Sequence, residues 1–249
     1  KKFFKVGNPS LTVVSSKRKK ILELLSQTPN KIFTIDDITS SASVSIGLVN
    51  ELVKLGTINI FFRHEFSAYK MCKPVFSKTL STAQKKASEE LCCLVSKKKY
   101  NTTLLRGVTG SGKTEVYLDA VSKALEMGRQ VLVLVPEIAL SIDFVKKVVD
   151  RYEVEPGQWH SGVQRKERHR LYSAVASNKV QLVIGARSAL FLPFVDLGLI
   201  VVDEEHDGSY KQEEKGIYQA RDMAVVRASI EKIPLLLVSA TPSLETSYN

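Results

Sequence analysis

One stretch of eight residues has the spacing of a phosphate-binding loop. It reads Gly107-Val108-Thr109-Gly110-Ser111-Gly112-Lys113-Thr114 and matches G-x-x-x-x-G-K-[ST] at every fixed position. The glycines let backbone N–H groups approach phosphate oxygens, and the N-terminus of a following helix adds its positive dipole end. Lys113 is expected to reach the β- and γ-phosphates, and Thr114 to offer its hydroxyl to Mg²⁺. The chain is therefore predicted to bind a nucleoside triphosphate.

A second group of reactive side chains follows an apolar run further along the chain. The run 199–202 (LIVV) leads directly into 203–206 (DEEH). A buried strand of this kind delivers acids to its carboxyl end, beside the phosphate-binding loop. Asp203 is expected to hold Mg²⁺ through water, and Glu204 to orient or deprotonate the attacking water. With Lys113, these two acids are the predicted catalytic residues.

Short apolar runs alternate with helical stretches around both groups. The predicted strands are 102–106, 130–135, 180–184, 197–202 and 234–239, and the predicted helices are 114–127, 139–150, 164–177 and 222–231. This alternation predicts an α/β domain with a largely parallel sheet. Its ligands are expected at the carboxyl ends of the strands.

The first 79 residues differ from the rest in charge. They carry 13 Lys and Arg against 5 Asp and Glu, which accounts for +8 of the chain's net charge of +10. Nucleic acid is the first partner to expect for such a surface, because an excess of Lys and Arg neutralises the negative charge of the phosphates. A basic surface with no specific partner is the alternative.

The same segment has the element order of a winged helix-turn-helix. Helices are predicted at 17–27, from Asp36 and at 43–55, and strands at 32–34, 58–62 and around Tyr69. The third helix would be the recognition helix, yet it contains no Arg for bidentate reading of guanine. Contacts to the DNA backbone or to DNA structure are therefore expected. A purely architectural module is the alternative.

Composition and sequence patterns exclude disordered, collagen-like, disulfide-scaffold and membrane-spanning proteins. The chain has 249 residues, of which 44% are hydrophobic and 25% charged, as in ordinary globular proteins. Three cysteines without a C-x-x-C pair give no disulfide framework and no zinc site. No apolar run is long enough for a bilayer and no signal peptide opens the chain, so a cytoplasmic protein without a membrane partner is expected. The chain begins without Met and stops after a strand-like run, which indicates a piece of a longer protein.

Four segments follow from these patterns. They are an extension or linker at 1–15, a winged-helix DNA-binding domain at 16–70, a linker at 71–79 and an ATP-binding lobe at 80–249. The fold class is therefore an α/β P-loop NTPase lobe of the RecA type preceded by a small α+β domain.

Several motifs within 80–249 carry a family resemblance. They are GVTGSGKTEVY, LVPEIAL, GARSALFLPF, DEEHDGSYKQE, ARDMAVVRA and SATPSLE. Together they resemble the first RecA-like lobe of the DExH branch of superfamily 2 helicases, and most closely the PriA family of bacterial replication-restart helicases (primosomal protein N′). The resemblance implies an ATP- and Mg²⁺-dependent DNA helicase that moves 3′→5′, acts at stalled or branched forks and loads the primosome.

The resemblance also implies partners and further domains. The partners are forked and single-stranded DNA, single-strand-binding protein and primosome proteins, and the protein is expected to be a monomer. The further parts are a domain that binds DNA 3′ ends, a second helicase lobe with a zinc-binding insertion, and a C-terminal domain. Without the arginines of a second lobe, this chain is expected to hydrolyse ATP poorly.

Roles for individual residues follow from the same resemblance. Gln84 would read adenine, since a carboxamide both donates and accepts hydrogen bonds. The triplet Ser239-Ala240-Thr241 would hydrogen-bond toward Asp203 and His206 and relay the nucleotide state. The DNA strand would be gripped by 136–140 (PEIAL), by Arg187 with Ser188, and by a possible contact from His160-Ser161.

The segment 210–222 resembles the family's loop that couples DNA to ATP hydrolysis. Its candidate DNA contacts are Tyr210, Lys211, Tyr218 and Arg221. Two residues depart from the family pattern: Ile217 replaces an aromatic or basic residue, and Gln219 stands where His is usual. Looser coupling is one expectation, and an ordered surface loop with inward-packed tyrosines is the alternative.

Two other functions fit parts of the sequence. Another class of P-loop ATPase, such as a kinase or an AAA-type remodeller, would share the phosphate-binding loop, although the pairing of DEEH with the SAT triplet disfavours it. A DNA-binding module whose ATPase-like domain only senses nucleotide is the second. The intact Lys113 and Glu204 disfavour that alternative.

Overall fold

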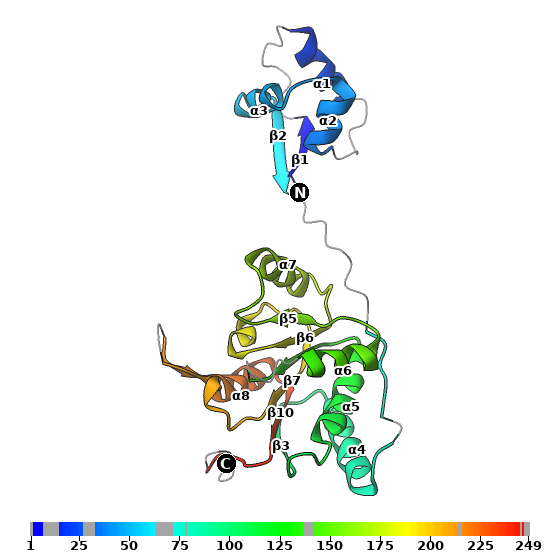
Figure 1. The fold of residues 1–249 in the computed structure, drawn as a ribbon, viewed down its shortest axis with the longest axis vertical. Coiled ribbons are helices and arrows are strands. Elements are labelled where there is room, and N and C mark those ends of the chain that lie inside the picture. The colour runs from blue at the N-terminus through cyan, green and yellow to red at the C-terminus, as the bar shows by residue number, and fades with distance from the viewer. Residues whose placement is uncertain are drawn as a thin grey trace. The chain divides into compact units, whose positions relative to one another are not determined.

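A computed structural model describes residues 2–6, 15–26, 33–62, 72–77, 79–136, 142–213, 216–244 and 246. The chain divides into two compact units, Lys1–Ser67 and Ala68–Asn249 (Figure 1). No helix among these residues is long and apolar enough to cross a membrane.

The first unit packs three helices against one another beside a two-stranded ribbon. The helices are α1 (Ser16–Ser26), α2 (Ile35–Ala42) and α3 (Ile46–Lys54), and the ribbon pairs β1 (Lys2–Val6) antiparallel with β2 (Ile58–Phe62). Apolar residues at helical spacing form its core: Ile21, Leu25, Ile38, Val49 and Leu52. Thr34 and Asp37 form a capping box at the start of α2. The three predicted helices and the strand at 58–62 are confirmed.

Three features of this unit differ from the sequence-based expectations. The strand at 32–34 is represented by a single bridge residue, Phe33, and the strand expected near Tyr69 lies outside the described residues. Residues 2–6 belong to the ribbon, whereas 1–15 were expected to form an extension. The sequence analysis did not predict this strand, because its partner strand lies more than 50 residues further along the chain. The described elements do not by themselves define a winged helix.

The second unit is built on a six-stranded parallel sheet. The strand order is β3 (Asn101–Arg106), β10 (Pro234–Ser239), β7 (Leu197–Asp203), β4 (Gln130–Leu134), β6 (Leu182–Gly185) and β5 (Gly157–Trp159). The central strands are buried along almost their whole length, as expected for a sheet covered on both faces. The predicted parallel α/β fold is confirmed. The three-residue β5 was not predicted, because so short a run carries no periodicity.

Helices cover both faces of the sheet (Figure 1). One face carries α4 (Thr82–Ser96), α5 (Lys113–Glu126) and α6 (Ile142–Tyr152), whose side chains share the main core with alternate residues of β4, β6, β7 and β10. The short 3₁₀ helix η2 (Arg187–Phe191) and α8 (Ala220–Glu231) contact each other, and α8 packs on β7 and β10; α7 (Arg165–Ala176) contacts β5. The layers bring the carboxyl ends of β3, β10 and β7 together.

The segment 72–77, expected within a linker, is bound to the second unit. The Cys72 amide donates to Gln181 Oε1 at 3.1 Å, and the Ser77 amide donates to Asp119 Oδ1 at 2.8 Å. Arg151 of α6 donates to the Val75 carbonyl and forms a buried ion pair with Asp119 of α5. This segment therefore belongs to the lobe, because its backbone supplies partners for buried charges there.

Candidate nucleotide site and nucleic-acid interface

The phosphate-binding loop joins β3 to α5, as its sequence predicts. Gly110 and Gly112 have φ values of +77° and +79°, a region that other residues adopt only with strain. A Cβ atom at Gly107 would lie 2.6 Å from Ser111 Oγ, so a larger residue at this position would require the Ser111 side chain to move. Backbone geometry or space thus accounts for the two glycines that the motif fixes, Gly107 and Gly112, and for the additional Gly110.

The loop and the helix after it provide donors suited to phosphate. Lys113, the first residue of α5, donates from Nζ to the Gly107 carbonyl at 2.8 Å and to the Val108 carbonyl at 3.3 Å. Its ammonium group therefore lies over the loop. The first amides of α5 have no acceptor within the helix, which leaves them available to an anion. The residues present fit the triphosphate of a nucleotide.

Gln84 contacts this loop directly. Its Nε2 donates to the Ser111 carbonyl at 2.8 Å, and its Oε1 accepts from the Ser81 amide at 2.8 Å in a capping box at the start of α4. Both ends of the carboxamide that was expected to read adenine are thus bonded within the protein. The pattern S-x-x-Q at 81–84 is the signal for this cap.

Asp203 is the last residue of β7 and is held by three protein groups. Tyr117 donates its hydroxyl to Asp203 Oδ2 at 2.9 Å, and the Glu204 amide donates to Oδ1 at 3.0 Å. The Tyr210 hydroxyl donates to the backbone carbonyl of Asp203 at 2.6 Å. Burial raises the pKa of the Asp203 carboxyl, while the Tyr117 hydrogen bond and the Lys113 charge act in the opposite direction. The sequence reasoning overlooked Tyr117, although it lies one helical turn after Thr114.

The side chains of the three residues after Asp203 lie in different environments. Glu204 has a φ of +47°, so the chain turns sharply where β7 ends, and its side chain remains partly exposed. His206 Nδ1 lies 3.7 Å from Glu204 Oε2. Glu205 is fully buried. The turn therefore separates a catalytic candidate from a structural carboxylate.

Glu205 forms a buried ion pair with Arg221. Arg221 Nη1 lies 3.3 Å from Glu205 Oε2, and the Ser243 amide donates to Glu205 Oε1 at 2.9 Å. Arg221 is 8% exposed. The expectation that Arg221 contacts DNA differs from this geometry, because its guanidinium neutralises an interior charge. A run of sequence letters cannot distinguish the two environments.

The SAT triplet joins the acidic turn to the phosphate-binding loop. Ser239 Oγ lies 2.7 Å from His206 Nδ1 and accepts from the Thr241 amide at 3.2 Å. The Gly107 amide donates to the Ser239 carbonyl at 3.3 Å. Ala240, between Ser239 and Thr241 in the chain, is partly exposed. The expected contact with His206 is thus present, while Asp203 is paired across the sheet with Val238, one residue earlier.

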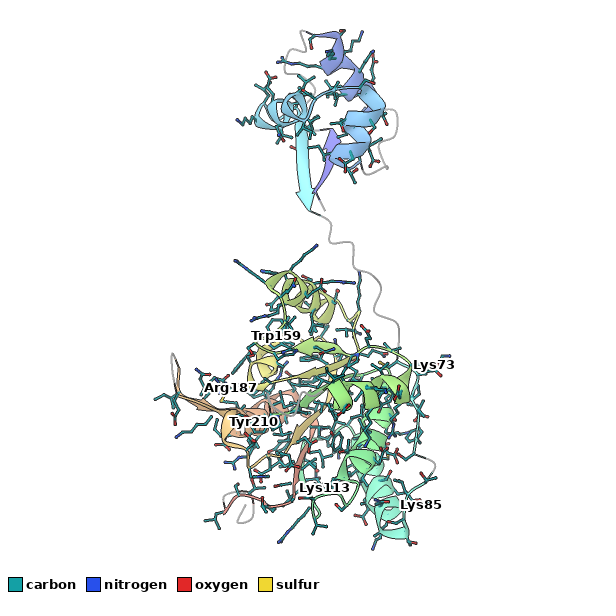
Figure 2. All side chains as sticks on the ribbon, viewed as in Figure 1. Lys73, Lys85, Lys113, Trp159, Arg187 and Tyr210 are labelled. Carbon is teal, nitrogen blue, oxygen red and sulfur yellow. The ribbon has the colours of Figure 1, made fainter. Side chains whose placement is uncertain are left out.

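A polar cavity of about 260 Å³ lies where the ends of β4 and β6 meet Ser209, Gln212 and Tyr218. Its lining includes His160, Ser161, Arg168, Arg187, Ser188 and Tyr218. Arg187 Nη1 donates to the Ser209 carbonyl at 2.9 Å and to the Lys211 carbonyl at 2.8 Å. Trp159 Nε1 donates to Ser188 Oγ at 3.1 Å. Arg187 and Trp159 are labelled in Figure 2. Residues 137–140 of the PEIAL motif lie outside the described residues.

The remaining candidate DNA contacts in the segment 210–222 differ in exposure. Tyr210, in the 3₁₀ turn η3 (Gly208–Tyr210), is 1% exposed, so its ring is unavailable to a base in this conformation. Lys211 is exposed and pairs with Glu213 at 2.9 Å in a small hairpin of β8 (Lys211–Gln212) and β9 (Tyr218–Gln219). The Tyr218 ring packs edge-on against Phe191 at 5.2 Å. The alternative of an inward-packed tyrosine applies to Tyr210.

The two residues that depart from the family pattern are both described. Ile217 is 83% exposed. The Oε1 atom of Gln219 is buried with no hydrogen-bond partner among the residues that the structure covers. Metal-binding clusters of three or more His, Cys, Asp or Glu are likewise absent from that part of the chain, and its three cysteines are free.

The parallel sheet, the phosphate-binding loop and the acidic turn beside it define a P-loop nucleotide-binding lobe of the helicase type. The chain belongs to the DEAD/DEAH box helicase family, whose model matches residues 81–248. A solved structure, the Pyrococcus furiosus Hef helicase domain, is 18% identical with a TM-score of 0.47, covering 66% of this chain and 33% of that one.

Curated relatives narrow the resemblance to one kind of helicase. Replication restart protein PriA of Rickettsia prowazekii is 52% identical over 147 residues, covering 59% of this chain and 23% of the relative. The Bacillus subtilis PriA is 35% identical over 236 residues (93% and 29%), and the Chlamydia muridarum PriA is 38% identical over 226 residues (88% and 30%). The chain therefore spans less than a third of the length of each of these three relatives. The resemblance to PriA that the motifs indicate is confirmed.

Proposed function

We propose that this chain is the winged-helix module and first motor lobe of an ATP-dependent DNA helicase that restarts replication in the bacterial cytoplasm. The helicase would move 3′→5′ at stalled or branched forks and load the primosome there. Its partners would be single-strand-binding protein and the primosome proteins. One observation carries the proposal: β3, β10 and β7 are neighbours, so the phosphate-binding loop, the SAT triplet and the acidic turn meet at one edge of the sheet. The PriA relatives support the particular process.

The nucleotide roles follow from the donors and acceptors at this edge. Lys113 and the first amides of α5 would bind the phosphates, and Thr114 and Asp203 would hold Mg²⁺. The metal ion, when bound, neutralises charge on the phosphates. Glu204 would orient the attacking water or accept its proton, since its carboxylate is partly exposed beside Asp203.

The DNA strand is proposed to run past the cavity lined by Arg187, Ser188 and Tyr218. A guanidinium suits phosphate, and a partly exposed aromatic ring suits a base. Arg187 already touches both residues that flank Tyr210, and Tyr210 touches Asp203. Occupation of the cavity would therefore reach the acidic turn in two steps, from Arg187 to the backbone on either side of Tyr210 and from the Tyr210 hydroxyl to Asp203.

Binding of a fluorescent ATP analogue tests the proposal. Lys113→Ala should abolish Mg²⁺-dependent binding, because it removes the charge beside the phosphates. Lys123→Ala is the matched control, since Lys123 lies on the same helix and pairs only with the exposed Glu126 among the contacts seen. Equal binding by both variants would overturn the nucleotide site.

Turnover provides a second test of the roles. Glu204→Gln should retain nucleotide binding and lose hydrolysis. The chain alone is proposed to hydrolyse ATP poorly even with single-stranded DNA, because arginines supplied from a second lobe are worth several orders of magnitude in rate. Robust DNA-stimulated turnover by the purified chain would contradict this part of the proposal.

A further inference from the structure

Tyr117 is a fully buried tyrosine whose hydroxyl points at the acidic turn. It lies on α5, is 0% exposed and packs within the main core. Its hydroxyl donates to Asp203 Oδ2 at 2.9 Å, from the side of the sheet that α5 covers. The roles proposed above for the nucleotide site do not use it.

The hydroxyl adds nothing to packing that phenylalanine would not supply. Burying a phenolic hydroxyl is costly unless it is hydrogen-bonded, so its value at this position lies in the bond it makes. That bond orients one oxygen of a carboxylate whose other oxygen accepts from the Glu204 amide. The plane of the Asp203 carboxylate is therefore held from two directions.

The same helix positions the other side chain expected at the metal. Thr114 lies one turn before Tyr117 on α5, and its side chain lies beside the Tyr117 hydroxyl. Thr114 and Tyr117 lie on one rigid helix, and Tyr117 donates to Asp203. This helix therefore links Thr114 to Asp203, although the two residues are far apart in the sequence. Groups that hold metal ligands in this way typically change metal affinity 10- to 100-fold when removed.

We propose that Tyr117 is a positioning residue for Mg²⁺, which fixes the Asp203 carboxylate and aligns it with Thr114. This inference rests on the proposed nucleotide site. It assigns Tyr117 no contact with the nucleotide, so the hydroxyl should affect binding only when the metal ion is present.

The test compares two buried tyrosines whose hydroxyls donate to different acceptors, Tyr117 on α5 and Tyr152 on α6. Tyr117→Phe removes the hydroxyl at Asp203. Tyr152→Phe is the matched control, because Tyr152 is equally buried and donates to the Leu118 carbonyl at 2.8 Å, away from the acidic turn. Binding of a fluorescent ADP analogue to each purified chain is measured across Mg²⁺ concentrations and in excess EDTA.

The expected result is a Mg²⁺ requirement that rises about 10-fold or more in Tyr117→Phe and is unchanged in Tyr152→Phe. Binding in EDTA should be the same for all three proteins. An unchanged Mg²⁺ requirement in folded Tyr117→Phe would overturn the inference, as would an equal loss in EDTA. Wild-type protein that binds no nucleotide, or binds it equally after Lys113→Ala, would instead overturn the proposed nucleotide site.

Discussion

The imidazole of His206 lies 2.7 Å, measured from Nδ1, from the hydroxyl oxygen of Ser239. The contact joins the turn after β7 to the end of β10, and the Ser239 carbonyl accepts from the first residue of the phosphate-binding loop. We therefore expect a change at the nucleotide to reach the acidic turn through Ser239 and His206. Coupling of this kind is reciprocal, so DNA and nucleotide should alter each other's affinity equally.

Ser239→Ala should reduce this reciprocal effect. The substitution removes the partner of His206 and changes no side chain of the phosphate-binding loop or of the cavity that Arg187 lines. The measurement is the affinity for single-stranded DNA with and without Mg²⁺ and nucleotide. The ratio of the two affinities should approach one in Ser239→Ala and remain at the wild-type value in Ser229→Ala, an exposed serine on α8. A wild-type ratio in Ser239→Ala would exclude the contact as the route of coupling.

Arg221→Ala should lower stability and have little direct effect on DNA binding. It leaves the Glu205 carboxylate buried without its cationic partner, a change that typically costs about 3 kcal/mol or more. The only tryptophan, Trp159, lies in the second unit, so its fluorescence during urea unfolding reports the stability of that unit. Arg165→Ala, at the exposed start of α7, is the control. Normal stability with weakened DNA binding would instead favour the contact expected from the sequence.

Arg187→Ala should weaken binding of single-stranded DNA and reduce its dependence on salt. Each phosphate contact contributes about 0.7 to the slope of log affinity against log salt for single strands, so the slope should fall by roughly that amount. Fluorescence anisotropy at several salt concentrations measures both quantities. Lys97→Ala, at the end of α4 and before β3, tests an exposed charge near the opposite edge of the sheet. Identical losses in the two variants would indicate that only general surface charge matters.

The chain should bind forked DNA in preference to linear duplex and single-stranded DNA, and the preference should persist at higher salt. The reason is that the segment with a net charge of +8 includes a helix, α3, without arginine, which suits recognition of structure over sequence. Anisotropy with the three DNAs at two salt concentrations provides the measurement. Equal binding that disappears with salt would mean that the basic unit only releases counterions.

Local patterns were sufficient for most of the fold of the second unit. Each central strand is a continuous apolar run, and each helix has apolar residues at helical spacing, so neither depends on distant partners for recognition. The phosphate-binding loop could likewise be predicted from the sequence, since the geometry of the loop itself favours glycine at positions 107, 110 and 112. The order of β3, β10 and β7 in the sheet then follows from packing, which periodicity does not encode.

The sequence by itself determined the chemistry available to this protein: a phosphate-binding loop, acids after an apolar strand and an excess of positive charge near the start. The tertiary structure alone decided which polar side chains are functional candidates and which are internal partners. Arg221 and Tyr210 look like DNA contacts in the sequence, yet one pairs with Glu205 and the other binds the Asp203 backbone. Tyr117 looks like an ordinary core residue, yet its hydroxyl donates to the Asp203 carboxylate. The physical reason is that burial and hydrogen-bond partners arise between distant segments, while residue type and spacing are local.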